Sequence, residues 1–357
     1  MNISNLCIDI KKYFSDKKTD FGENLFNEVK KETINFSKNL TFFDLKNKID
    51  DDYLDFILYF YCQHNKNLFF IIVWPVTYNF DQIIKDCYNQ YGNIIFKKEI
   101  KLNDNGITNI LNLIGDKVNH TNGKELWFAE PHRTINPLTI YLFETKKNDV
   151  KENEMFDYLV QIFNNNKDYI SNIQKSEGLN NLYCTTKVKR ECRELLKNNN
   201  CVSPISFAPD KNYSHHVNDE HWETIEMSRV FFNNNSIYAI SHCDFRYKCE
   251  SFNNKYIKYF NFINNNKWGD IYDFCLNNSS ILSQFGIRQS RDIDYLHNID
   301  FNINKQIPEE EISSHNYVVK SECDININDL IYNPKNHFWY KNIKFCTLNK
   351  LLEFKKN

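Results

Sequence analysis

The sequence has few of the residues that build tight phosphate-binding loops, and its cysteines form no pattern. Its 357 residues include only 8 Gly and 7 Pro. No glycine-rich Walker or Rossmann loop occurs, which disfavours P-loop and dinucleotide-binding proteins. The 11 Cys include no CxxC pair and have no regular spacing, so we expect reduced, buried thiols rather than a disulfide framework or a zinc site.

Charge and hydropathy give no sign of a nucleic-acid-binding or a membrane protein. The net charge is -2, so no strong basic field indicates a nucleic-acid partner. The most apolar run, Leu68–Val73, has the length of a strand and is far too short to cross a membrane. The N-terminus lacks the basic region and apolar run of a signal peptide. We therefore expect a cytoplasmic protein with no membrane partner.

The length and the apolar patterning predict an α+β protein of several parts. Residues 1–65 predict a helical N-terminal extension, because apolar residues such as Leu25 and Val29 recur at helical spacing. Residues 66–245 and 246–357 predict two further domains. The 41% of hydrophobic residues is enough to supply their cores.

The middle region alternates strand and helix patterns. Strands are expected at Leu68–Val73, Asn93–Ile100 and Pro137–Glu144, which are rich in β-branched and aromatic residues. The charged, Asn-rich segment Lys147–Gly178 predicts an inserted or extended surface segment, and Thr186–Leu196 predicts a short basic helix.

This order of elements resembles nucleoside diphosphate kinase over about residues 66–245. His216, with Asp219 and Glu223 after it, stands where that family has its catalytic histidine motif. The resemblance implies a ferredoxin-like fold and a phosphohistidine at His216, whose ring Asp219 or Glu223 orients. Trp74 stands in place of the family's strand-end lysine, which favours ligand binding without turnover.

The cluster around His216 has two other interpretations. His215, His216 and His221 with neighbouring acids have spacings that suit a zinc site. Alternatively, the segment is a polar helix N-terminus, at which Asn218 or Asp219 caps the helix and the acids suit its dipole.

The segment Asn278–Leu296 ends in two acids, Asp292 and Asp294, separated by one apolar residue. On a strand, alternate side chains share a face, so both carboxylates are expected to point the same way. Two such carboxylates repel each other unless a cation lies between them. The pair therefore predicts a site for Mg²⁺ or Mn²⁺, which bind carboxylates together with substrate phosphates.

The residues before this pair carry a second resemblance. Asn278-Ser279 stands where a Gly-Ser turn would open a helix, Phe285-Gly286-Ile287-Arg288 follows, and 12 residues separate Ser279 from Asp292. This arrangement resembles the nucleotidyltransferase superfamily, especially its AbiEii-like branch. The resemblance implies a minimal nucleotidyltransferase-like α/β domain at the C-terminal end.

The same resemblance implies further site residues. Asp324, with Asp329 as a second candidate, would supply a third metal-binding carboxylate. The two arginines of the segment would contact phosphate, although a structural ion pair with the acids is the alternative. The implied nucleotide-binding residues are Ser279, Ser280, Arg288, Arg291 and Lys355.

The sequence thus predicts metal-dependent nucleotidyl or phosphoryl transfer from a nucleoside triphosphate to an acceptor hydroxyl. The candidate catalytic residues are Asp292, Asp294 and His216. Three alternatives stay open: a phosphohistidine-type phosphotransferase centred on His216, a glycosyltransferase that uses a nucleotide sugar at Asp292 and Asp294, and an inactive nucleotide-binding module. The acceptor is not specified by any motif.

Overall fold

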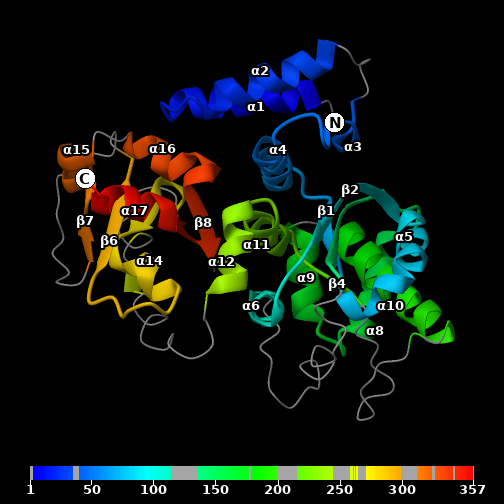
Figure 1. The fold of residues 1–357 in the computed structure, drawn as a ribbon. Helices are drawn as coiled ribbons and strands as arrows, with labels where there is room; N and C mark the ends of the chain where they lie inside the picture. The colour runs from blue at the N-terminus through cyan, green and yellow to red at the C-terminus, as the bar shows by residue number, and fades with distance from the viewer. Residues whose placement is uncertain are drawn as a thin grey trace. The chain divides into compact units, whose positions relative to one another are not determined.

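The protein has an α+β architecture, which confirms the predicted class. The computed structural model contains fifteen α-helices and two small sheets in the part it describes (Figure 1). Within that part, none of the helices combines the length and the apolar character that crossing a membrane requires. The described residues are 3–34, 40–113, 136–176, 178–199, 201, 215–243, 258–259, 261, 263, 271–298, 312–323, 326–340 and 342–356.

The chain forms two compact units. Unit 1 comprises Met1–Tyr61 and Ser228–Asn357, and unit 2 comprises Cys62–Met227. Two helices, α4 (Asp51–His64) and α11 (His221–Phe231), carry the chain across the division. The division into independently folding domains at residues 65 and 245 stays a prediction.

Unit 2 is built on a four-stranded antiparallel sheet. The strand order is β2 (Gly92–Ile100), β3 (Leu138–Thr145), β1 (Leu68–Val73) and β4 (His215–Val217). The first three were predicted and are confirmed to within a residue or two. Every residue of β1 is buried, as its unbroken apolar run indicates. The strand β4 is too short to show alternation in the sequence.

Helices cover one face of this sheet, as Figure 1 shows for α5 and α10. The alternate residues Phe69, Ile71 and Val73 of β1 share a buried cluster with Ile84 of α5 and Val188 of α10. The helices of unit 2 are α5 (Asp81–Asn89), α6 (Asp104–Leu113), α8 (Glu152–Ile162), α9 (Lys167–Ser176) and α10 (Leu179–Asn198), with a 3₁₀ turn η1 at Pro75–Phe80.

The segment Lys147–Gly178, expected as an inserted or extended surface segment, is largely helical. The segment forms α8 and α9, which pack against the start of α10. Met155 and Leu159 on one helix and Ile170 on the other are buried, because apolar residues at helical spacing are interspersed among the charges and asparagines.

Unit 1 combines helices from the N-terminal segment with a five-stranded mixed sheet. The N-terminal helices are α1 (Ile3–Asp16), α2 (Phe21–Ile34), α3 (Phe42–Leu45) and α4, which confirms the helical prediction for this segment. The strand order is β7 (Ile312–Ser314), β6 (Ile293–His297), β5 (Phe274–Asn277), β9 (Ile343–Cys346) and β8 (His337–Tyr340). The other helices are α12 (Asn234–His242), α14 (Ser279–Gln284), α15 (Asn316–Cys323), α16 (Ile327–Tyr332) and α17 (Leu348–Lys356), with 3₁₀ turns η2 (Ile271–Asp273) and η3 (Pro334–Asn336).

Polar contacts join the N-terminal helices to the segments around this sheet. The Lys17 ammonium lies 2.8 Å from the Asp273 carboxylate, and the Thr19 hydroxyl donates to Asp329 at 3.0 Å. The two ends of unit 1, far apart in the sequence, are thereby held together.

Gly92 allows β2 to approach β3 closely. A Cβ atom at this position would lie 2.3 Å from the backbone oxygen of Glu144, a contact that can be relieved only by a backbone shift. We expect Gly92→Ala to lower the free energy of unfolding by about 1–3 kcal/mol, measured by urea denaturation. Asn93→Ala, at the exposed neighbour, serves as the control, and equal stability of the two variants would contradict the prediction.

Candidate functional site

The turn between β5 and α14 has an unusual backbone. Asn278 has φ 51° and ψ -128°, a conformation that normally requires glycine. It is also the position at which the resembled family has glycine. The turn sends the chain from the end of β5 through α14 and back along β6, antiparallel to β5.

Asp294 lies at the start of β6 and is only 5% exposed. Its carboxylate accepts hydrogen bonds from His315 Nε2 at 2.9 Å, Ser313 Oγ at 3.2 Å and Asn278 Nδ2 at 3.3 Å. Burial alone would raise the pKa of Asp294. The hydrogen bonds from His315, Asn278 and Ser313 outweigh it, so the pKa lies below its ordinary value.

His315 connects the turn to the acid. Asn278 Nδ2 donates to His315 Nδ1 at 2.6 Å, so in this arrangement Nδ1 accepts and the proton on Nε2 points to Asp294. The parallel pairing of β6 with β7 places Ser313 directly beside Asp294, and His315 follows two residues later. His315 could not be identified from the sequence, because only this strand register relates it to Asp294.

Asp292 has a different environment. The strand β6 begins at Ile293, so the prediction of a shared strand holds for Asp294, and Asp292 lies one residue before it. Asp292 is exposed. Ser279 Oγ lies 3.5 Å from its Oδ1 and 2.8 Å from Ser290 Oγ. One exposed and one buried carboxylate therefore lie on either side of Ile293, both beside the start of α14.

The predicted phosphate-binding residues differ in exposure. Ser280 is fully buried, so Ser279 is the member of the pair whose hydroxyl lies beside a carboxylate. Arg288 and Arg291 are exposed in the segment between α14 and β6. Lys355 is exposed on α17, which packs against α14.

The third carboxylate is not placed by the structure. Asp324 lies outside the described residues. Asp329, the second candidate, accepts from Thr19, from Asn333 at 3.1 Å and from Asn336 at 2.8 Å. These contacts join α16 to its neighbours and include neither Asp292 nor Asp294.

The chemistry of the donor set nevertheless suits a divalent cation. Among the described residues, no three His, Cys, Asp or Glu side chains are grouped so that they could hold a metal ion on their own. Asp292 and Asp294 offer hard oxygen ligands, whereas both ring nitrogens of His315 are engaged by Asn278 and Asp294. A cation that arrives with a nucleotide would receive its remaining ligands from phosphate and water.

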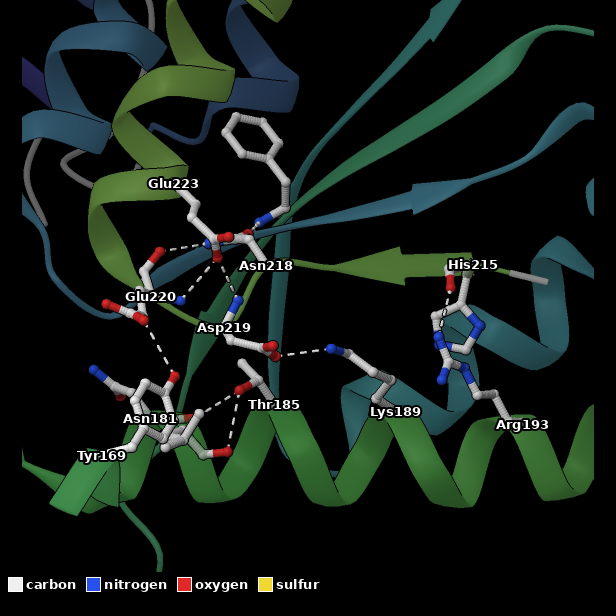
Figure 2. A network of polar contacts seen from close by, with 12 residues as sticks. Tyr169, Asn181, Thr185, Lys189, Arg193, His215, Asn218, Asp219, Glu220 and Glu223 are labelled. Carbon is white, nitrogen blue, oxygen red and sulfur yellow. Dashed lines mark hydrogen bonds and ion pairs between the residues drawn. The ribbon is translucent and has the colours of Figure 1, made fainter. Parts of the chain in front are cut away.

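The second candidate cluster, around His216, lies in unit 2, and Figure 2 shows its neighbours His215, Asn218, Asp219 and Glu223. Beyond the end of β4, side chains continue the pairing with β1: Asn218 Oδ1 accepts from the Phe70 amide at 2.7 Å, and the Thr224 hydroxyl donates to the Leu68 carbonyl at 2.7 Å. Asn218 Nδ2 also donates to Thr224 Oγ1 at 2.8 Å. These contacts attach the start of α11 to the central strand.

The acids of this cluster also make local contacts. Glu223 accepts from the backbone amides of Asp219 at 2.8 Å and Glu220 at 3.1 Å, so its side chain caps the start of α11. Burial raises the pKa of Glu223, although these two hydrogen bonds lower it in part. Figure 2 shows Lys189 of α10 reaching Asp219, at 2.7 Å. This agrees with the interpretation as a polar helix N-terminus.

The three histidines have separate surroundings. His215 Nε2 lies 2.8 Å from the Tyr88 hydroxyl, and His221 Nε2 donates to the Cys62 carbonyl at 2.8 Å. His216 lies between them on β4, opposite Ile72 of β1. The described contacts of Asp219 and Glu223 go to Lys189 and to the backbone, and the role of His216 as a phosphohistidine stays a prediction.

Comparison of the chain with protein-family models, with curated proteins and with solved structures found no match.

Removing the Asn218 side chain tests the pairing beyond β4. Asn218→Ala takes away the acceptor of the buried Phe70 amide, and a lost buried partner costs about 1–3 kcal/mol of unfolding free energy. Thermal and urea unfolding would measure the loss. Asn198→Ala, at the exposed end of α10, is the matched control and should leave stability unchanged. A similar result for both variants would contradict the structural role of Asn218.

The buried His215 predicts a pH dependence of stability. Burial, then Arg193 and Lys189, hold the pKa of His215 well below 6.5, so it stays neutral in the folded protein while the unfolded chain takes up a proton. The free energy of unfolding should therefore fall as the pH drops below about 6.5, by up to about 1.4 kcal/mol per pH unit from this group.

His215→Gln should remove this part of the slope. Urea denaturation of both proteins between pH 7.5 and 5 gives the difference. Parallel pH profiles of the two proteins would show that His215 is not the group responsible.

Proposed function

We propose that unit 1 is a metal-dependent nucleotidyltransferase, which moves a nucleotidyl group from a nucleoside triphosphate to an acceptor hydroxyl. The observation that carries this proposal is the arrangement at the end of β5. There a glycine-like turn at Asn278 leads through α14 to Asp292 and Asp294, and the turn's own side chain donates to Asp294.

A buried carboxylate with a lowered pKa supports this proposal. Burial of a charge is costly unless hydrogen bonds or an opposite charge compensate it. Asp294 is kept ionised by hydrogen bonds from Asn278, Ser313 and His315, and none of these three partners is a lysine or an arginine. Such a carboxylate keeps its capacity for a cation. The nearby exposed Asp292 offers a second ligand on the solvent side.

In the proposed reaction the acceptor oxygen bonds to the α-phosphorus of the triphosphate. The bond from that phosphorus to the bridging oxygen breaks, pyrophosphate leaves, and the hydroxyl proton passes to solvent. A divalent cation bound at Asp292 and Asp294 would supply neutralisation of the phosphate charge. Arg288 and Arg291, both exposed beside this segment, would bind phosphate oxygens.

We further propose that unit 2 has a ferredoxin-like fold related to that of nucleoside diphosphate kinase. The antiparallel order β2-β3-β1-β4, with α5 after β1 and α10 after β3, supports it. The structural contacts of Asn218 and Glu223, together with Trp74 in place of lysine, favour a unit without phosphotransfer of its own.

Ligand-dependent thermal unfolding tests the nucleotide site. We expect ATP, GTP, CTP or UTP to raise the melting temperature only in the presence of Mg²⁺ or Mn²⁺. A ligand at 100 times its dissociation constant stabilises the folded state by about 2.7 kcal/mol. The shift should vanish in the double variant Asp292→Asn/Asp294→Asn and persist in Asp9→Asn, an exposed acid of α1.

Product analysis then separates the alternatives. Pyrophosphate release with hydroxyl acceptors supports nucleotidyl transfer, whereas a shift with UDP-glucose and release of UDP would indicate a glycosyltransferase instead. A nucleotide-dependent shift that survives in the double variant and disappears in His216→Ala would move the chemistry to unit 2 and overturn the proposal.

A further inference from the structure

The helix α14 ends in a turn that leaves an apolar side chain exposed. Gly286 has φ 65°, its amide donates to the Ser283 carbonyl at 3.1 Å, and the Ile287 amide donates to the Leu282 carbonyl at 2.9 Å. These two bonds are those of a Schellman motif, in which the apolar residue after the glycine commonly packs back onto the helix. Ile287 is instead 62% exposed, so the end of α14 presents apolar surface to solvent.

Two stacked rings lie beside this helix end. Tyr238 and His242, one turn apart on α12, have ring centroids 4.0 Å apart and ring planes at 20°. His242 Nδ1 lies 2.8 Å from the Tyr238 carbonyl, which fixes the imidazole against the phenol ring. Tyr238 is 52% exposed, and its ring centroid lies 6.3 Å from that of Phe285, the residue that ends α14. Tyr238, His242 and Phe285 thus form an aromatic platform whose Tyr238 and His242 side chains are open to solvent.

The aromatic platform and the two acids lie at opposite ends of one short helix. The six residues of α14 make it about 9 Å long. Its first residue, Ser279, lies beside Asp292, and Phe285 follows its last. The exposed Arg288 lies in the segment that leads from the platform back to Asp292. A nucleoside triphosphate has the matching chemistry, because its charged phosphates and its flat base are the two ends of one extended molecule.

We propose that the aromatic platform stacks against the base of the nucleoside triphosphate whose phosphates bind beside Asp292 and Asp294. The inference rests on the proposed function for the presence of this ligand. Every base has a π-face, so stacking on an aromatic side chain contributes to binding whichever base is present. The platform therefore adds affinity without selecting one base, and the binding of ATP, GTP, CTP and UTP should depend on Tyr238 alike.

A ligand without a base separates stacking from phosphate binding. Isothermal titration calorimetry of the full chain with Mg²⁺ measures the affinities for ATP and for inorganic tripolyphosphate. We expect Tyr238→Ala to weaken ATP binding by about 5- to 150-fold, the range for one stacked base, and to leave the affinity for tripolyphosphate unchanged. Tyr238→Phe keeps the ring and should bind ATP as the wild type does. Tyr317→Ala, at an exposed tyrosine of α15, is the matched control and should bind both ligands normally.

The outcomes distinguish the aromatic platform from the transferase proposal. If Tyr238→Ala binds ATP as the wild type does, or loses affinity for ATP and tripolyphosphate equally, the platform is overturned and the transferase proposal stands. If Tyr238→Ala loses affinity for ATP alone while Asp292→Asn/Asp294→Asn binds ATP as the wild type does, the platform is upheld and the metal-dependent transferase is overturned. If the wild-type chain binds neither ligand with Mg²⁺ or Mn²⁺, both are overturned.

Discussion

The buried carboxylate of Asp294 is the constraint around which unit 1 is arranged. Removing a carboxylate from water costs several kcal/mol unless donors or a cation replace the lost hydration. The donors here come from three separate segments: Asn278 in the turn after β5, Ser313 on β7, and His315 just before α15. The strained turn and the parallel pairing of β6 with β7 therefore meet at one charge, and a change in either would leave it poorly matched.

Unit 2 also depends on hydrogen-bond partners for buried polar groups, which here are the peptide groups of its central strand. Its central strand β1 is wholly buried, so every peptide group along it needs a partner. The strand β4 is only three residues long, and Asn218 and Thr224 supply the acceptor and donor that it lacks. A cluster of histidines and acids thus has a structural use that requires no ligand, since its polar groups satisfy a strand end and a helix start.

The parts of the fold that could be predicted from the sequence are those in which a pattern is complete within one segment. The strands β1, β2 and β3 have continuous or β-branched apolar runs. The pair Asp292 and Asp294, separated only by Ile293, could also be recognised without knowledge of the fold. The helices α8 and α9 were not predicted, because their few apolar residues are spread among asparagines and charges. The contact of Asp294 with His315 could not be predicted, because it arises from strand pairing between distant segments.

Asparagine takes most of the positive-φ positions among the described residues of this glycine-poor chain. Six described residues other than glycine have positive φ, and all but Lys18 are asparagines, which tolerate this region better than other side chains. At position 278 the side chain has a further chemical role, because a glycine could only shape the turn, whereas Asn278 also donates to Asp294 and to His315. The residue that forms the turn thus also supplies a hydrogen bond to the buried carboxylate and another to the imidazole beside it.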